Sequence, residues 1–324
     1  MKVGLGAIHE LDDERLAFVK QLGVDHIIVH TPELRGDGFW EFEDLVRLRT
    51  RAESAGLTLA AIENIPRRFY DHVLEGGPRR DEQIEKVQKT IRNLGRAGIP
   101  ILGYHFMVLG VWRTGHNPVG RGGAKVTVYD HNLVANAPVA DVGPVDDETM
   151  WARLEYFLKA VVPVAEEEGV VLALHPDDPP ISPIAGVARI IRSVEAYKRV
   201  MEIVPSPSNA IEFCQGTIAE MCSRPEEVYE AIRYFGSRKK IAYVHFRNVT
   251  GPVPTFAETF IDEGYVDMLQ AIRAYHEVGF DGVIIDDHTP AVAGDAPWGH
   301  RGRAYSIGYI KALIKAVNYY EGGK

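Results

Sequence analysis

Four residues that can bind a metal ion follow one another at wide intervals in the second half of the sequence. They are His175, Cys214, His245 and Asp287, and each stands at or near the end of a short apolar run. The separations of 39, 31 and 42 residues (175 to 214, 214 to 245 and 245 to 287) each fit one strand plus one helix. Two imidazoles, a thiolate and a carboxylate suit Zn²⁺, Fe²⁺ or Mn²⁺, and the soft thiolate favours the first two. We therefore expect the four side chains to converge on one ion.

The cysteine also admits a different role. Cys214 could be a nucleophile activated by a histidine base, although this alternative would not require the other ligand-type residues. The second cysteine, Cys222, lies in a polar stretch beyond the apolar run, and we expect it to be chemically inert. Asp286 competes with Asp287 for the carboxylate position.

Ionisable residues end several of the other apolar runs as well. His30, Glu63, His105, Arg247 and His288 all stand at such positions. A lone histidine at the end of a strand is more often structural than functional. Several ionisable groups at successive strand ends would each lose hydration free energy without a shared role, so their number favours a functional site.

Eight short apolar runs alternate with longer segments of helical periodicity. The runs are continuous rather than alternating, as parallel strands covered on both faces are. The predicted strands are 2–8, 26–30, 57–64, 101–107, 170–176, 209–216, 241–248 and 282–288. The predicted helices are 12–22, 40–55, 81–97, 147–168, 186–204, 225–235, 266–278 and 304–320. Eight β/α units predict an α/β fold, the (β/α)8 TIM barrel, whose active site lies at the carboxyl ends of the strands.

One connection is far longer than the rest. Residues 108–146 separate the fourth strand from its helix, whereas loops from strand to helix usually span about 2–6 residues. We expect this insertion to be a lid over the active site or a substrate-binding segment. The alternative is a contact between subunits.

Length and composition limit the class of protein. The 324 residues are 46% hydrophobic and 25% charged, which is enough to bury a large core, and we expect one domain over 1–324. The net charge of −9 disfavours nucleic acids and anionic membranes as partners. The N-terminal residues lack the pattern of a signal peptide, and no apolar run reaches the roughly 18 residues of a membrane span. Two cysteines make no disulfide framework, so we expect a cytoplasmic protein.

Several segments resemble the signature segments of mannonate dehydratases, which belong to the xylose-isomerase-like barrels. They are YHFM (104–107), HPDDPP (175–180), FCQG (213–216), YVHFRN (243–248) and DH (287–288). The similarity extends over most of the chain, from LTLAAIENIP to RAYSIGYIKAL. It implies that D-mannonate loses water to give 2-keto-3-deoxy-D-gluconate. It also implies that His175, Cys214, His245 and Asp287 hold the ion, and that this ion is Mn²⁺ or Fe²⁺ rather than the zinc that thiolate softness alone favours.

The chemistry of such a dehydration requires further groups. Removing a proton next to a carboxylate is difficult unless the developing charge is stabilised, and expelling a hydroxyl needs a proton donor. We expect His288 and Tyr305 to be the acid and the base, in an order that the sequence does not fix. The alternatives are a histidine that only supports the metal site and a tyrosine packed at the start of the last helix.

We expect four further residues to contact the substrate: Glu63, His105, Arg113 and Arg247. Arg247 lies two residues beyond His245 and is expected to bind the substrate carboxylate, its alternative being an ion pair at the rim. Arg113, in VWRTG, matches a segment that is similar in the family. Asp177 or Asp178 is expected to orient a metal ligand or an arginine, while Pro176 fixes the path of the chain.

Two other functions compete with this one. A metal-dependent sugar isomerase or epimerase of the same superfamily would use mainly Glu and Asp ligands, so a thiolate counts against it. A metal-stabilised binding protein without enzymatic activity is the second alternative. The expected partners are a small sugar acid and further copies of the chain in a homo-oligomer.

Overall fold

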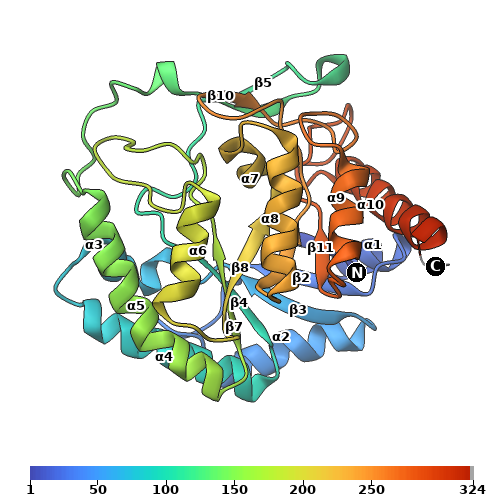
Figure 1. The fold of residues 1–324 in the computed structure, drawn as a ribbon. Coiled ribbons are helices and arrows are strands. Elements are labelled where there is room, and N and C mark those ends of the chain that lie inside the picture. Colours follow the sequence, from blue (N-terminus) through green and yellow to red (C-terminus); the bar gives the residue numbers. More distant parts are fainter. Residues whose placement is uncertain (322–324) are drawn as a thin grey trace.

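The computed structural model describes residues 1–321 and contains a closed barrel of eight parallel strands. Around the barrel the strands follow the order β1-β11-β9-β8-β7-β4-β3-β2 (Figure 1). Their bounds are β1 (Lys2–Ile8), β2 (His26–His30), β3 (Thr58–Glu63), β4 (Ile101–His105), β7 (Val171–His175), β8 (Asn209–Cys214), β9 (Ile241–His245) and β11 (Val283–Ile285). The predicted (β/α)8 barrel is confirmed, and all eight strands fall within the predicted ranges.

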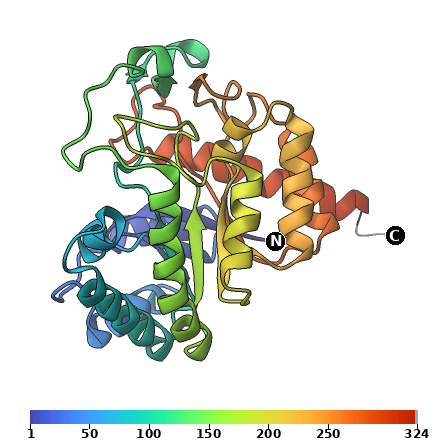
Figure 2. The same cartoon turned by 60° about the vertical axis from the view of Figure 1, so that its left-hand side comes forward.

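Helices cover the outside of the barrel. The main ones are α1 (Asp13–Gln21), α2 (Phe42–Ser54), α4 (Arg80–Ala97), α5 (Asp147–Glu167), α6 (Val194–Ile203), α8 (Pro225–Ser237), α9 (Met268–Glu277) and α10 (His300–Glu321). Figure 2 shows α5 in green and α6 in yellow side by side on the outer surface. Gly98 ends α4 with a φ of 71°, a left-handed conformation that glycine adopts without steric cost.

The apolar core has two parts, as a covered barrel requires. A small cluster fills the inside of the barrel and is rich in alanine and β-branched residues; its buried members are Ile28, Ala60, Ala61, Ala173, Tyr243, Val283 and Ile285. A much larger cluster lies between the strands and the helices. Because both faces of every strand are covered, the strand sequences read as continuous apolar runs.

The register of the strands brings their final residues together. His30 pairs with Glu63 across β2 and β3, and His105 pairs with His175 across β4 and β7. Cys214 pairs with His245 across β8 and β9. The ionisable strand ends therefore lie at one level, at the carboxyl end of the barrel.

Several predicted boundaries are wrong at the functional end, where the strands predicted to reach residues 107, 248 and 288 end at His105, His245 and Ile285. The helix expected from Gly186 begins only at Val194, where Ser193 caps it by accepting a hydrogen bond from the backbone N–H of Ala196. The strand expected to reach residue 216 ends at Cys214, and the helix α7 (Gln215–Met221) follows without a loop. The short helix α3 (Asp71–Glu75) was also not expected.

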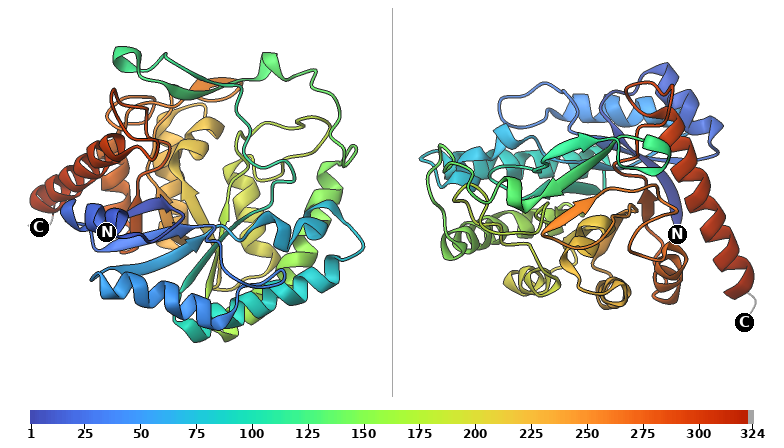
Figure 3. Two further views of the ribbon diagram at one scale, coloured as in Figure 1. Left: turned by 180° about the vertical axis from the view of Figure 1, so that it is seen from behind. Right: turned by 90° about the horizontal axis from the view of Figure 1, so that it is seen from above.

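The long insertion contains ordered structure of its own. It forms two short strands, β5 (Gly115–Asn117) and β6 (Val126–Asp130), and β6 pairs with β10 (Thr255–Ala257), a strand in the connection after β9 that was not predicted. Seen from above, the green β5 and β6 and the orange β10 lie across the barrel (right panel of Figure 3). Within residues 1–321, no helix combines the length and the apolar character that crossing a membrane demands.

Candidate metal centre

A cavity of about 180 Å³ opens where the strand ends meet. Six histidines contribute to its lining: His9, His30, His105, His175, His245 and His288. Glu63, Asn64, Asp178 and Asp287 add polar groups, while Val111 of the insertion lines it from above. Among the described residues that line this cavity there is no lysine or arginine.

His175, Cys214 and His245 come together as predicted. One ligand atom of each lies within 4.8 Å of the others, and all three residues are buried. The Nδ1–H of His175 donates a hydrogen bond to the carbonyl oxygen of Pro176 at 2.7 Å. A neutral imidazole bonded in this way keeps its lone pair on Nε2, the nitrogen available to a metal.

The thiol of Cys214 lies in surroundings that favour its ionised form. Burial opposes ionisation, but the positive charge of Arg247 and a hydrogen bond with His175 outweigh it and hold the pKa of Cys214 well below its usual value. The hydroxyl of Thr217 also donates to Sγ at 3.1 Å. The thiolate is the form that binds metals.

Asp287 reaches the same place from β11. Its Oδ2 lies 3.4 Å from Nδ1 of His245. Burial opposes ionisation of this carboxyl, but His288 and His245 outweigh it and hold the pKa of Asp287 well below its usual value. Asp286 points elsewhere, because its carboxylate pairs with Arg303 at 2.7 Å, so Asp287 is the aspartate of the two that lies near the histidines.

The residues fit a divalent cation. Two buried atoms of the group, Nδ1 of His245 and Oε1 of Glu212, have no hydrogen-bond partner within residues 1–321. Buried polar atoms without partners cost free energy, which a bound cation would offset. The negative character of the group is visible at His175, where burial opposes protonation but Glu212 and Cys214 raise its pKa to about 10.

Glu212 is the functional residue that sequence reasoning missed. Its side chain is fully buried, with Oε1 at 3.0 Å from Nε2 of His245 and 3.7 Å from Nε2 of His175. Its Oε2 accepts a hydrogen bond from the hydroxyl of Tyr243 at 2.5 Å. Glu212 stands two residues before Cys214 on the same strand, so both side chains point to the same face. This spacing was the signal available in the sequence.

His288 lies beside the cluster in a constrained conformation. Its φ of 44° is in the left-handed region, which non-glycine residues seldom adopt and which is common at functional sites. Its Nδ1 lies 2.5 Å from Oε1 of Glu258, and its Nε2 lies 3.5 Å from Oδ1 of Asp287. Although His288 is partly exposed to solvent, desolvation still opposes its protonation, and the carboxylates of Asp287 and Glu258 outweigh this effect and raise its pKa.

Arg247 is placed differently from the prediction. Its side chain is 3% exposed, and its donors bond to Glu220 at 3.0 Å, Asp178 at 3.0 Å and Thr217 at 2.8 Å. Its Nε also lies 3.0 Å from Oδ2 of Asp287. Because these protein groups occupy the guanidinium, Arg247 does not face the cavity, and the expected pair with the substrate carboxylate has no geometric support. Its position is that of a buried support for Asp287.

Arg113 also binds carboxylates of the protein. Its guanidinium donates to both oxygens of Asp178, and Nη2 donates to Glu258 at 2.9 Å. Asp178 thus orients two arginines, one of the roles expected for Asp177 or Asp178. Arg113 does not line the cavity; it ties the insertion to the connection after β7.

Tyr305 is not brought to the cluster. It lies on α10 with 43% of its surface exposed, and its hydroxyl is 3.5 Å from Nη2 of Arg121 in the insertion. Its ring packs edge-on against Phe260. The catalytic role stays a prediction, and in this arrangement Tyr305 lies outside the residues that line the cavity.

Glu63 and His105 line the cavity, and their contact with the substrate stays a prediction. Oε2 of Glu63 lies 2.8 Å from Nε2 of His245. Burial and the neighbouring His175 lower the pKa of His105 to about 3, so its ring is neutral. Nδ1 of His105 accepts the backbone N–H of Met107 at 3.3 Å, which leaves its proton on Nε2.

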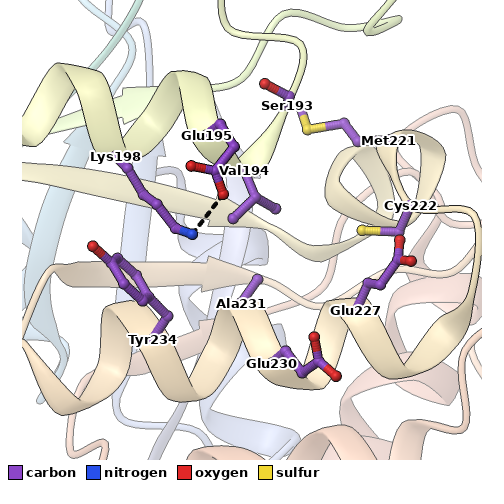
Figure 4. Close-up of a pocket in the computed structure, with 10 residues that line it drawn as sticks. All are labelled: Ser193, Val194, Glu195, Lys198, Met221, Cys222, Glu227, Glu230, Ala231 and Tyr234. Atoms are coloured by element: carbon purple, nitrogen blue, oxygen red, sulfur yellow. Dashed lines mark hydrogen bonds and ion pairs between the residues drawn. The ribbon is translucent and has the colours of Figure 1, made fainter.

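A larger groove of about 460 Å³ lies elsewhere, on the outside between α6, α7 and α8 (Figure 4). Its charged residues are lysine and glutamates of the kind found on most protein surfaces, and Lys198 pairs with Glu195 at 2.6 Å. Cys222 lies in this groove, where burial and the nearby Glu227 and Glu230 raise its pKa to about 12. A thiol in that state is unreactive, in line with the expectation for Cys222.

The fold alone already relates the chain to a known class. A xylose isomerase domain protein from Planctomyces limnophilus has a TM-score of 0.64 over 98% of both chains, at 14% identity. Together with the closed parallel barrel, this similarity places the chain among the (β/α)8 barrel folds.

Within this class the family can be stated. The model of the family described as D-mannonate dehydratase (UxuA) matches residues 6–143 and 137–322. The chain belongs to the D-mannonate dehydratase family. It is 32% identical to a mannonate dehydratase from Thermotoga maritima over 95% of both chains. The crystal structure of mannonate dehydratase from Streptococcus suis serotype 2 has a TM-score of 0.90 at 30% identity, covering 99% of this chain and 96% of that one.

Proposed function

We propose that this chain is a hydro-lyase that removes water from D-mannonate to give 2-keto-3-deoxy-D-gluconate. We propose further that a divalent ion, Mn²⁺ or Fe²⁺, is held by His175, Cys214, His245 and Asp287. The observation that carries the proposal is the convergence of the buried His175, Cys214 and His245 beside a polar cavity, with Asp287 next to His245, in a chain whose family dehydrates mannonate. Support for the ion comes from the unpartnered Nδ1 of His245 and the ionised thiol of Cys214.

The ion would stabilise the negative charge that develops when the proton next to the substrate carboxylate is removed. The protein residues then bind and orient the sugar acid. Because no lysine or arginine lines the described cavity, histidines supply the hydrogen-bond donors near the anionic end. Neutral His105 can donate its Nε2–H to a substrate oxygen, and Asn64 offers an amide at the same cavity.

His288 is the group we assign to proton transfer. It lines the cavity next to Asp287, and Glu258 fixes its ring through Nδ1. A protonated histidine held in this way can give a proton to the departing hydroxyl, and the neutral form can take one. Tyr305 remains the predicted partner, although its hydroxyl contacts Arg121 in this arrangement.

The insertion is assigned to substrate enclosure. Val111 lines the cavity itself, and His116 on β5 lines a neighbouring cavity of about 490 Å³ that shares Ala7, Asp287 and His288 with it. The open face of the cavity is therefore bounded by residues of the insertion, which supports a lid.

A homo-oligomer is proposed as well, because five of the nine exposed large apolar residues in the described chain lie in the insertion. They are Val111, Val119, Leu133, Val139 and Val142.

We also propose that the protein works in the cytoplasm. Both cysteines are free, and Cys214 can serve as a ligand only while it stays reduced. A reducing compartment preserves that state.

Product analysis tests the proposed reaction. The purified chain is incubated with Mn²⁺ and a panel of sugar acids, and the products are identified by NMR. We expect a 2-keto-3-deoxy acid from D-mannonate. An isomeric sugar or sugar acid would instead indicate an isomerase or epimerase, and a protein that is stabilised by the metal but turns over no sugar acid would be a binding protein.

A further inference from the structure

We propose that Glu63 and Glu212 act together as positioning residues that hold the Nε2–H of His245 and so present its Nδ1 to the metal ion. The two carboxylates would fix the tautomer and the angle of the ring. This inference rests on the metal centre proposed above, and it adds two residues that do not themselves belong to the predicted ligand set.

The contacts of His245 carry the argument. Its Nε2 is hydrogen-bonded to Oε2 of Glu63 at 2.8 Å and forms a close ion pair with Oε1 of Glu212 at 3.0 Å. Its Nδ1 has no hydrogen-bond partner within residues 1–321, and it lies 3.4 Å from Oδ2 of Asp287, another predicted ligand. The two nitrogens of one ring thus face two different environments.

The chemistry of imidazole assigns each nitrogen. The hydrogen bond between Nε2 and a carboxylate oxygen of Glu63 is donated by an N–H, so the nitrogen between Glu63 and Glu212 carries the proton. In the neutral ring the lone pair is then on Nδ1, beside Asp287. Histidine ligands of metals commonly donate their other N–H to a carboxylate, which fixes the ring and increases the basicity of the ligand nitrogen.

The two carboxylates approach the ring from different sides of the barrel. Glu212 belongs to β8, which is next to the β9 strand of His245, while Glu63 belongs to β3, which lies four strands away around the barrel. The ring is therefore held between a neighbouring strand and the opposite wall. Rotation about its side-chain bonds would break at least one of the two contacts.

The side chain of Glu212 is itself held in place by a hydrogen bond from the neighbouring strand. Its register partner on β9 is Tyr243, whose hydroxyl donates to Oε2 at 2.5 Å. The absence of a side chain at Gly103 makes room for this pair, because a Cβ there would lie 2.4 Å from the Tyr243 hydroxyl and 3.3 Å from Oε2 of Glu212. Glycine at position 103 and tyrosine at position 243 are thus part of the same arrangement.

A second cation between Glu63, Glu212 and His245 is the main rival, since these three residues also form a compact group of possible ligands. Such an ion would have to replace the proton on Nε2. With Nδ1 bound to the first ion and Nε2 bound to the second, the ring of His245 would have to lose both protons and become an imidazolate. A proton on Nε2 keeps the ring neutral. The 2.8 Å contact with Glu63 is a hydrogen bond, and the ion pair with Glu212 at 3.0 Å places a second carboxylate at the same nitrogen.

The test measures Mn²⁺ binding through the electron paramagnetic resonance signal of the free ion, in the wild type and in Glu212→Gln, Glu63→Gln and Tyr243→Phe. We expect the Kd for Mn²⁺ to rise about 10- to 100-fold in the two Gln variants and by less in Tyr243→Phe. Tyr197→Phe is the matched control, because its hydroxyl is also buried and donates only to the carbonyl oxygen of Leu174. It should bind Mn²⁺ like the wild type.

Co²⁺ spectra separate positioning from direct ligation. The absorption of the thiolate–Co²⁺ bond and the coordination number should persist in both Gln variants, while binding weakens. Unchanged affinity in both variants, a changed coordination number, or two ions per chain in the wild type would overturn the proposal. A wild type that binds no ion, or a Cys214→Ser variant that binds as well as the wild type, would instead contradict the metal centre on which it rests.

The tautomer can also be observed without any substitution, which matters if a variant does not fold. In the Zn²⁺-loaded wild type, nitrogen NMR should find the proton of the His245 ring on Nε2. A proton on Nδ1 would overturn the proposal.

Discussion

The guanidinium of Arg113 and the carboxylate of Asp178 form two parallel hydrogen bonds, although the residues are 65 positions apart. This ion pair joins the insertion to the connection after β7. Asp178 also accepts a bond from Arg247 at 3.0 Å, so one buried carboxylate links the insertion, the metal-binding strands and the cavity. Removing only one partner of such a buried, hydrogen-bonded ion pair costs much free energy of folding, because the other charge is left without its partner.

Asp178→Asn should destabilise the protein strongly. It leaves the buried guanidiniums of Arg113 and Arg247 short of negative charge, and removing one partner of a buried pair typically costs about 3–5 kcal/mol. Urea unfolding followed by circular dichroism measures the change in the free energy of unfolding. Asp25→Asn is the control, because it removes an exposed pair with Lys20 and should change little. Equal stability of the Asp178 and Asp25 variants would contradict the account.

The same pair predicts the dependence of stability on pH. Burial opposes ionisation of Asp178, but Arg113 and Arg247 outweigh it and hold its pKa below the ordinary 3.8. Since the folded state has the lower pKa, this contribution to stability is fully present above the unfolded value and is lost as the pH falls below it. The wild type should therefore lose stability below pH 3.8 more steeply than Asp178→Asn. Parallel pH profiles would count against the pairing.

His288→Asn should reduce kcat by about 10²–10⁴-fold with little change in KM, as expected for a group that transfers a proton. Tyr305→Phe should also lower kcat if Tyr305 is the partner group, although its hydroxyl contacts Arg121 and lies outside the cavity in this arrangement. Steady-state kinetics on D-mannonate compares the two. A loss as large as that in His288→Asn would imply that α10 or the insertion moves, and a kcat like that of the wild type would remove Tyr305 from the reaction.

Much of this site was predictable because barrel strands end at a common level. His175, Cys214 and His245 are each the last residue of a strand, and the regular β/α spacing was enough to group them with Asp287. Glu212 was missed because it stands one strand period before the final residue, where its side chain still points into the barrel.

Local sequence patterns could not predict the position of Glu258 or the residues that pair with Arg113 and Arg247. Glu258 follows β10, and its position beside His288 depends on the pairing of β10 with β6 of the insertion. Arg247 looked like a substrate ligand because it follows His245 by two residues. Only the three-dimensional arrangement reveals that Asp178 and Glu220 already occupy its donors.

Arg113→Lys tests the insertion as a lid. Lysine keeps the charge but cannot form the two parallel bonds to Asp178, so the insertion should be held less firmly over the cavity. We expect a higher KM for D-mannonate while the Kd for Mn²⁺ stays near that of the wild type. An unchanged KM would indicate that the insertion serves another role, such as contact between subunits.

Cys214→Ser should weaken metal binding without unfolding the barrel. The hydroxyl keeps the size of the side chain but not the thiolate, so the Kd for Mn²⁺ should rise by more than the roughly 10- to 100-fold typical of supporting residues. Thermal unfolding with and without Mn²⁺ reports the same loss, because ligand at 100 times its Kd stabilises a folded protein by about 2.7 kcal/mol. A variant that Mn²⁺ stabilises as much as the wild type would remove Cys214 from the ligand set.

The proposed metal centre places one ion beside the cavity, bound by four residues at the carboxyl ends of the strands. Anomalous diffraction at the manganese absorption edge, from crystals of the Mn²⁺-loaded protein, locates that ion. We predict one strong peak within bonding distance of Nε2 of His175, Sγ of Cys214, Nδ1 of His245 and a carboxylate oxygen of Asp287. A peak bonded to Glu63 and Glu212 instead, or no peak in this cavity while Mn²⁺-dependent dehydration of D-mannonate proceeds, would contradict it.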